Sequence, residues 1–433
     1  MISHGAALGL ARRFDTPFYV YDLDDVAARC HELRGVLPPG ALLYYSLKAN
    51  PLPVVAAAAR QAGARVEVSS EGELAAARAA GFDPSAILYT GPAKNERELA
   101  HAFASGVGAF SAESFRDLAK ISAAAEHAGT IPRVLLRINP PKSIRAGLAM
   151  TGVPSQFGFD EDEIASSLLP ERYPRIQFAG LHVYLGTQVP ASELAASFRI
   201  GFAVAARLVP LVPLRFLDLG GGFPWPFATT DPPPDLLPLA FSLAGFEAAR
   251  DLAGGAELWF ESGRYLAASC GTLVARVLDV KRSQGTLFVI LDAGVAHLGG
   301  MSGLGRLFPP AVSLVSLRAV QRGEPLVADV VGPLCTPLDC LGRAVLVPAV
   351  EPGDLVAIAN VGAYGATASL TAFLSRPAAL EISLRGGRIV DVARLSARHE
   401  PVDRTFPLRR AAPGADDERE DDVVSIEVPG SAP

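Results

Sequence analysis

The sequence predicts a parallel (β/α)8 barrel followed by a mostly β second domain, and a change of texture along the chain is the main reason. Between residues 40 and 270, short apolar runs alternate with alanine-rich segments of helical character. This alternation is typical of parallel α/β folds. After about residue 270 the runs become β-branched, are broken by Gly and Pro, and show little helical spacing. That second pattern predicts an all-β domain, either a sandwich or a barrel.

Eight apolar runs supply the strands of the predicted barrel. They are residues 42–49, 65–70, 87–90, 108–112, 133–139, 178–186, 216–222 and 257–262. Stretches such as EGELAAARAAGF and SFRDLAKISAAAEHAG lie between them and are expected to be helical. An open doubly wound sheet is the alternative, but the Gly-rich fingerprint expected after its first strand is missing.

The same patterns set the expected domain boundaries. The run FYVYDLD at 18–24 is strand-like and precedes the barrel pattern, so residues 1–24 are expected to contribute a strand to the β domain. Residues 25–270 are expected to form the barrel and residues 271–400 the β domain. Residues 401–433 are expected to be a disordered tail. Positions 411–433 hold seven acidic residues and one arginine, which account for the net charge of −6.

Composition restricts the class of protein. Half of the 433 residues are hydrophobic and 19% are charged, so a large buried core is expected. No apolar run has the length of a membrane span, and no signal-peptide pattern is evident. The four cysteines lack metal-ligand or disulfide spacing, which predicts a cytoplasmic protein without a zinc site. Nothing resembles the clustered Lys and Arg of a nucleic-acid surface.

Polar residues gather at the predicted carboxyl ends of the strands, where barrel enzymes carry their active sites. In chain order they are Lys48, Glu67, Arg137, His182, Tyr184, Thr187, Gly220, Gly221, Gly222, Glu261, Gly263 and Arg264. Each has a purely structural explanation: a lysine can extend to solvent, three glycines can form a tight turn, and Glu261 and Arg264 are spaced for a local ion pair. Together, however, a lysine, a glycine loop and a lone carboxylate are the groups needed to hold pyridoxal 5'-phosphate. The lysine forms the Schiff base, the loop brings backbone N–H groups to the phosphate, and the carboxylate keeps the ring nitrogen protonated.

The chain resembles the fold-type III pyridoxal-phosphate decarboxylases, the group that includes diaminopimelate, ornithine and arginine decarboxylases and shares its barrel with alanine racemases. The similarity runs from FDTPFYVYD (14–22) to about residue 385. Seven motifs occur in the family's order: YYSLKANP, VEVSSEGEL, GLHVYLGTQ, DLGGGFP, ESGRYL, GPLCTPLD and GAYG.

This resemblance implies a carboxy-lyase that acts on an amino acid of L or D configuration, as a head-to-tail homodimer with shared active sites. Lys48 would hold the cofactor covalently, and Glu261 would pair with its ring nitrogen. The other cofactor-binding residues would be Glu67, Arg137, Tyr184, Thr187, Gly221, Gly222, Gly263, Arg264 and Tyr364. The substrate-binding residues would be His182, Arg264, Asp339 and Tyr364. Cys335 would be the second catalytic residue, a proton donor that comes, like Asp339, from the partner subunit.

Three departures bear on the substrate. Tyr184 stands where the family usually has a histidine stacked on the cofactor ring, and Thr336 stands where diaminopimelate decarboxylases usually have a glutamate. Residues 292–310 lack those enzymes' Arg-Pro-x-x-Tyr element, so an arginine clamp for a distal carboxylate is not evident. The motifs look more like a subgroup in secondary metabolism that decarboxylates a glutamyl group tethered to an acyl carrier protein. A free diamino-acid decarboxylase is the alternative.

Two further alternatives have weaker support. Amino-acid racemases of this architecture use an arginine at the ring nitrogen, where this chain has Glu261. Non-catalytic barrel proteins that carry the same cofactor lack the β domain and the Cys335 segment. Inactive antizyme-inhibitor-like homologues have altered cofactor residues, whereas the lysine, the glycines and the glutamate are intact here.

Overall fold

The computed structural model describes residues 2–141, 146–244, 255–299, 311–397 and 399. Residues Met1–Ser396 form one compact unit, which contains both the barrel and the β domain. The predicted acidic tail at 401–433 lies outside the described residues. Residues 300–310 of the 292–310 stretch also lie outside them. Among the described residues, no helix is long and apolar enough to cross a membrane.

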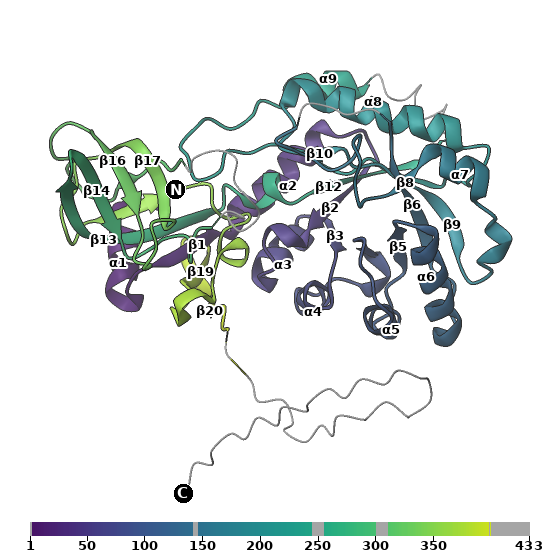
Figure 1. The fold of residues 1–433 in the computed structure, drawn as a ribbon, viewed down its shortest axis with the longest axis horizontal. Helices are drawn as coiled ribbons and strands as arrows, with labels where there is room; N and C mark the ends of the chain where they lie inside the picture. The colour runs from purple at the N-terminus through teal and green to yellow at the C-terminus, as the bar shows by residue number, and fades with distance from the viewer. Residues whose placement is uncertain (1, 142–145, 245–254, 300–310, 398, 400–433) are drawn as a thin grey trace, which may run out of the picture. The chain divides into compact units, whose positions relative to one another are not determined.

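Eight parallel strands close into a barrel, which confirms the predicted fold class (Figure 1). Their order is β5-β4-β3-β2-β12-β11-β9-β6, and β5 pairs with β6 to complete the ring. The strands are β2 (Leu42–Ser46), β3 (Arg65–Val68), β4 (Ile87–Tyr89), β5 (Ala109–Ala112), β6 (Arg133–Asn139), β9 (Gln177–His182), β11 (Phe216–Asp218) and β12 (Glu257–Ser262). Each falls within one of the eight apolar runs or extends it by a single residue.

Helices connect the strands and begin at well-defined caps. They are α2 (Leu23–Val36), α3 (Pro53–Gln61), α4 (Glu71–Ala79), α5 (Glu96–Ala104), α6 (Phe115–Ala128), α7 (Glu161–Ser167), α8 (Ala191–Leu208), α9 (Leu237–Ala244) and α11 (Arg264–Ala267). The side chain of Ser70 caps α4, that of Ser114 caps α6, and Asn95 forms a capping box with Glu98 on α5. These caps satisfy N–H groups that a helix start leaves without partners.

Short elements complete the barrel half of the chain. They are η1 (Leu47–Ala49), η2 (Pro84–Ala86), β7 (Leu148–Ala149), β8 (Phe159–Asp160), η3 (Pro170–Arg172) and β10 (Gly186–Thr187). β7 pairs with β10, and β8 pairs with the end of β6. Residues 146–158 are thereby held between these pairings, and Met150 and Phe157 line the cavity described below.

The barrel interior consists of two layers with opposite character. The lower layer is apolar and contains Tyr44, Leu88, Ala109, Leu135, Ala179, Phe216 and Trp259. Residues two positions further along a strand point the same way, so they form the next layer. That upper layer is polar and buried: Ser46, Glu67, Thr90, Ser111, Arg137, His182, Asp218 and Glu261. On β9 the step is three residues because the register with β6 shifts at Val134/Leu135.

The β domain is a second sheet of nine strands. Its strands are β1 (Phe18–Asp22), β13 (Gly271–Ser283), β14 (Thr286–Leu291), β15 (Val315–Ser316), β16 (Leu326–Val331), β17 (Cys340–Val347), β18 (Leu355–Ile358), β19 (Leu380–Arg385) and β20 (Arg388–Arg394). The short helices η5 (Ala366–Ala368) and η6 (Phe373–Ser375) precede β19. β1 lies between β13 and β19, so the strand-like run at 18–24 belongs to this sheet (Figure 1).

The sequence analysis did not predict helix α1 (His4–Phe14) or strand β17. α1 packs Ala7, Leu10 and Ala11 against Phe18, Val20 and residues of β13, β18 and β19. Its stability therefore comes from apolar contacts with strands distant in sequence, which its own residues do not reveal.

Two hydrogen bonds join the β domain to the barrel close to Lys48. The backbone N–H of Tyr364 donates to the carbonyl of Ala49 (2.7 Å), and the side-chain amide of Asn50 donates to the carbonyl of Gly362 (2.9 Å). These bonds hold the motifs YYSLKANP and GAYG, about 310 residues apart in sequence, against each other.

Candidate active site

A cavity of about 280 Å³ opens at the carboxyl end of the barrel strands. The described lining consists of Lys48, Glu67, Ser69, Thr90, Gly91, Pro92, Arg137, Met150, Phe157, His182, Tyr184, Thr187, Glu261, Arg264 and Tyr364. A narrower hollow shares Lys48 and Glu261 and adds Gly221, Gly222 and Gly263. The structure therefore brings together all the predicted cofactor-binding residues.

Lys48 lies on η1, directly after β2, with 41% of its side chain exposed to the cavity. Its Nζ is 3.2 Å from Oε2 of Glu67. Burial opposes the charge of the amine, but the carboxylates of Glu67 and Glu261 outweigh it and raise the pKa of Lys48 above its ordinary value. The amine is thus held as an ammonium, at the mouth of a cavity and close to a carboxylate that can take its proton.

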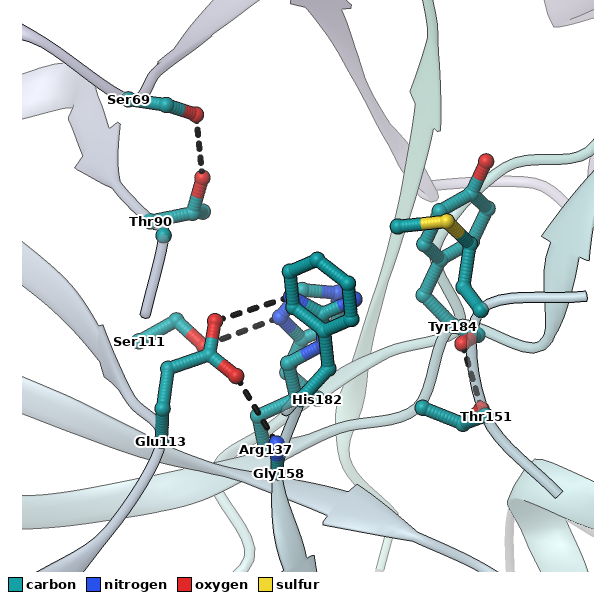
Figure 2. A network of polar contacts seen from close by, with 12 residues as sticks. Ser69, Thr90, Ser111, Glu113, Arg137, Thr151, Gly158, His182 and Tyr184 are labelled. Carbon is teal, nitrogen blue, oxygen red and sulfur yellow. Dashed lines mark hydrogen bonds and ion pairs between the residues drawn. The ribbon is translucent and has the colours of Figure 1, made fainter. Parts of the chain in front are cut away.

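Glu67 occupies the polar layer on β3 and is almost fully buried. Its Oε1 accepts hydrogen bonds from the hydroxyls of Thr90 and Ser69 (3.1 Å for Ser69), and these two hydroxyls also contact each other (Figure 2). Burial raises the pKa of Glu67, but Lys48 and the hydroxyls of Thr90 and Ser46 outweigh it and hold that pKa below its ordinary value. Glu67 is therefore an ionised partner for Lys48.

At the glycines of the narrower hollow, the neighbouring atoms leave no space for a side chain. A Cβ added to Gly221 would lie 2.3 Å from the carbonyl oxygen of Glu261, and one added to Gly263 would lie 2.6 Å from Cβ of Ala49. Gly222 has a φ of +102°, which L residues rarely adopt. Bare backbone therefore surrounds the narrower hollow on two sides, as a phosphate cradle requires.

Arg264 and Tyr364 form the third side of this hollow. The Arg264 guanidinium lies 4.7 Å from the centroid of the Tyr364 ring, and its buried Nε has no hydrogen-bond partner among the described residues. Tyr364 itself has a φ of +57°, a strained conformation for a residue with a bulky side chain. An anion in the hollow would satisfy the free guanidinium nitrogen, so these residues fit a phosphate group.

His182 lies deeper than Tyr184, in the polar layer of the barrel. Its Nδ1 is hydrogen-bonded to the hydroxyl of Ser111 (2.9 Å, Figure 2). Its Nε2 is 3.8 Å from Oε1 of Glu261. Burial, together with the charges of Arg137 and Lys48, lowers the pKa of His182 well below its ordinary value, so the imidazole is neutral.

Tyr184 lines the cavity, and its backbone carbonyl accepts a hydrogen bond from Thr151 (2.7 Å, Figure 2). The Arg137 guanidinium lies 5.9 Å from the Tyr184 ring and 4.6 Å from the Phe157 ring. The tyrosine is thus held by its backbone, and its aromatic ring borders the cavity.

Sequence analysis missed several residues that hold the site in place. Glu113 pairs with Arg137 (2.8 Å) and accepts from the backbone N–H of Gly158 (2.9 Å), which ties the β6–β8 segment to the barrel (Figure 2). Ser111 and Asp218 complete the polar layer. The sequence held one signal for them. Residues two positions apart on a strand point the same way, so Ser111 and Asp218 follow the apolar interior residues Ala109 and Phe216 into the layer of His182 and Glu261.

Cys335 and Asp339 are absent from the described lining of both hollows. They lie on the turn between β16 and β17, where Cys335 is exposed and Asp339 is buried. Both oxygens of Asp339 are occupied: one accepts from the N–H of Val295 and the other from the N–H of Leu334, each at 2.7 Å. In this protomer the carboxylate of Asp339 fixes the turn that carries Cys335.

The two adjoining hollows share Lys48, Glu261 and Arg264, and these residues fit the amine attachment, the ring nitrogen and the phosphate of pyridoxal phosphate. The family model "Pyridoxal-dependent decarboxylase, pyridoxal binding domain" matches residues 23–268. This chain belongs to that family, and it is a pyridoxal-phosphate-dependent carboxy-lyase, as the sequence predicted.

Individual relatives agree with this assignment. The L-glutamyl-[BtrI acyl-carrier protein] decarboxylase of Niallia circulans is 37% identical over 388 residues, 87% of this chain and 91% of the relative. The diaminopimelate decarboxylase of Deinococcus radiodurans is 32% identical over 391 residues, 89% of this chain and 94% of the relative. The crystal structure of diaminopimelate decarboxylase from Helicobacter pylori complexed with L-lysine superimposes with a TM-score of 0.77 at 27% identity, covering 89% of this chain and 95% of that one.

Proposed function

We propose that this enzyme removes the α-carboxylate from a glutamyl group carried as a thioester on an acyl carrier protein. The relative that acts on such a substrate is 37% identical to this chain, against 32% for a diaminopimelate decarboxylase. The motifs around Tyr184 and Thr336, which depart from the diaminopimelate pattern, favour the same assignment.

The observation that carries the proposal is the charge of the cavity wall. Among the described lining residues the cations are Lys48, Arg137 and Arg264. Lys48 is paired with Glu67, and Arg137 is paired with Glu113. Arg264 lies in the glycine hollow proposed for the phosphate. No cation of this lining is left for a distal carboxylate, whereas a neutral thioester needs none.

The apolar part of the lining suits an acyl chain. Pro92, Met150 and Phe157 lie on one wall of the cavity. Phe157 is fixed by its contact with the Arg137 guanidinium and by the bond from the next residue, Gly158, to Glu113. The uncharged middle of a glutamyl thioester would contact this wall without losing polar partners.

In this proposal each residue of the site has a defined task. Lys48 would anchor the cofactor, Gly221, Gly222, Gly263 and Arg264 would bind its phosphate, and Thr187 and Tyr364 border the same hollow. Tyr184 would lie against the cofactor ring, and Glu261 would pair with the ring nitrogen. Pyridoxal phosphate supplies, when bound, an electron-poor ring that accepts the electron pair of the breaking carbon–carboxyl bond. Glu67 pairs with Lys48, Arg137 pairs with Glu113 on the cavity wall, and His182 lies beside Glu261.

The proton donor completes the site, and we assign it to Cys335 of a second copy in a head-to-tail homodimer. Cys335 is exposed and is not in the described lining of its own protomer's cavity, which supports a donation across an interface. We place the enzyme in the cytoplasm, because its four cysteines are all free thiols.

Substrate competition tests the proposal directly. The holoenzyme is incubated with glutamyl-loaded carrier protein and, separately, with free glutamate, diaminopimelate, ornithine and lysine. We expect the loaded carrier protein to lose the mass of carbon dioxide and the free amino acids to remain unchanged. Turnover of a free diamino acid alone would refute the carrier-bound substrate.

Decarboxylation of a free diamino acid is the second candidate. The relatives after the first are diaminopimelate decarboxylases, and they match most of this chain. In that case the distal group would need a charged partner outside the described lining, and substitution of the residues around Met150 would change the ratio of turnover among diamino acids.

A further inference from the structure

Asp218 and Glu261 are neighbouring buried carboxyl groups for which the sequence motifs gave only one role. Asp218 ends β11, is completely buried, and does not line the cavity, whereas Glu261 on β12 does. One oxygen of each carboxyl group lies within 4.8 Å of an oxygen of the other. A carboxylate has no proton to donate, so a bond between two carboxyl groups requires that one of them is protonated.

The orientation of Asp218 is set by its own strand end. Its Oδ1 accepts from the backbone N–H of Gly220 (2.8 Å), which leaves Oδ2 buried with no partner of its own. Oε1 of Glu261 is also buried without a conventional donor among the described residues. One carboxyl oxygen of Asp218, one of Glu261 and a ring nitrogen of His182 lie within 4.8 Å of one another.

The surrounding cations are already engaged elsewhere. Arg137 is paired with Glu113 and Lys48 with Glu67, whereas His182 is neutral and uses its Nδ1 on Ser111. Asp218 and Glu261 are therefore two buried carboxyl groups that no cation among the described residues neutralises. Two uncompensated negative charges in such a place are far less stable than one.

We propose that Asp218 keeps its proton and donates a hydrogen bond to Glu261, so that the pair presents a single negative charge to the cofactor. The inference rests on the proposed role of Glu261 opposite the ring nitrogen. A cation at that position would favour the ionised form of the carboxyl group that lines the cavity, which is Glu261. The proton consequently remains on the deeper group, and Asp218 acts as a positioning residue beneath Glu261.

The protonation behaviour of both groups agrees with this arrangement. Burial raises the pKa of Asp218 to about 7, although the N–H of Gly220 opposes the shift. Burial and the neighbouring Asp218 raise the pKa of Glu261 well above its ordinary value. Both shifts oppose ionisation of the two groups together, and a cation at the ring nitrogen would decide which one releases its proton.

The test compares Asp218→Asn with Asp218→Ala in the holoenzyme. Asparagine keeps the shape of a protonated acid, accepts from Gly220 and donates to Glu261. We expect Asp218→Asn to change the dissociation constant of pyridoxal phosphate by less than about threefold. Alanine removes the donor, so we expect it to weaken binding by at least about tenfold, or about 1.4 kcal/mol. Ring protonation, read by NMR of the cofactor labelled at its ring nitrogen, should follow the same order.

Several results would overturn the inference. Asp218→Asn as damaging as Asp218→Ala would mean that Asp218 is ionised, and Asp218→Ala as tight as the unmodified enzyme would mean that it has no role. A stoichiometric divalent metal in the purified holoenzyme would assign these oxygens to metal binding. Should Asp218→Ala fail to fold, Asp218→Ser provides the smaller side chain. Glu261→Gln separates the underlying proposal: a ring nitrogen still protonated in that variant would refute the role of Glu261, whatever Asp218 does.

Discussion

Replacing Glu67 with glutamine tests how the protein controls the charge of Lys48. The substitution keeps the size of the side chain and can preserve its contacts with Thr90 and Ser69, but it removes the negative charge 3.2 Å from Nζ of Lys48. Because Glu67 raises the pKa of Lys48, its neutralisation must lower that pKa. The uncharged amine, which is the form that attaches the cofactor, then becomes available at lower pH.

The size of the effect follows from the geometry of the pair. Two unit charges at this separation attract by about 5 kcal/mol at an effective dielectric constant of about 20. Solvent reduces this value because 41% of the Lys48 side chain is exposed, and fully exposed pairs contribute only about 1 kcal/mol. We therefore expect about 2 kcal/mol, which corresponds to a decrease of about 1.5 pKa units and about a 30-fold gain in free amine.

The assay is reductive trapping of pyridoxal phosphate on the cofactor-free enzyme over a range of pH, with the attached mass read on the intact chain. Glu71→Gln is the matched control, since Glu71 is a neighbouring carboxylate that pairs with the exposed Arg97 instead. The midpoint of trapping should fall by about 1.5 pH units in Glu67→Gln and stay unchanged in Glu71→Gln. Coincident midpoints in all three proteins would refute the electrostatic argument.

Other substitutions test the remaining parts of the site. Lys48→Ala should abolish both the absorbance of the lysine-bound cofactor and turnover, and a variant that still traps the cofactor elsewhere at full yield would reject the assignment. Cys335→Ala should lower kcat by at least about tenfold, within the usual range for a general acid, with cofactor content unchanged; loss of cofactor would indicate a structural role instead. Asp339→Asn replaces one of the two carboxylate oxygens that each accept a backbone N–H bond, so it should lower the melting temperature and kcat without raising KM. A rise in KM alone would instead support direct contact with the substrate. Gly221→Ala forces a Cβ to within 2.3 Å of the Glu261 carbonyl, so cofactor affinity should fall at least about tenfold; titration of the purified variant with pyridoxal phosphate measures this, and unchanged affinity would place the phosphate elsewhere.

The positions of the cofactor residues were predictable because strand ends in a parallel barrel converge on one face. Lys48, Glu261 and the three glycines each follow an apolar run, and their chemistry is distinctive. The supporting residues Ser111, Glu113 and Asp218 carry no such signal alone. Their role depends on the register between strands, and on β9 a shift of one residue at the β6 pairing decides that His182 lies beside Asp218.

The assignment of Asp339 shows why motif order does not define a side chain's partners. Its place in GPLCTPLD predicted a substrate contact, and that role stays a prediction for the partner subunit's site. Within the protomer, its carboxylate is taken up by the backbone of Val295 and Leu334. Those two N–H groups come from segments some 40 residues apart, so only the folded chain shows that each donates to one oxygen of this carboxylate.

In the proposed site, the charges of the polar layer would favour a cationic ring nitrogen. Glu67 and Glu113 each neutralise one basic side chain, which leaves the Asp218–Glu261 pair as the acidic group without a cation among the described residues. A protonated ring nitrogen would supply that missing charge, and an unprotonated one would leave Glu261 either buried without compensation or protonated. An arginine in place of Glu261, as in the racemases, would instead add a third cation beside Lys48 and Arg137 while leaving Asp218 to balance it. The electron-withdrawing form of the cofactor, which decarboxylation requires, would therefore be favoured by the charges of the whole polar layer and not by Glu261 alone.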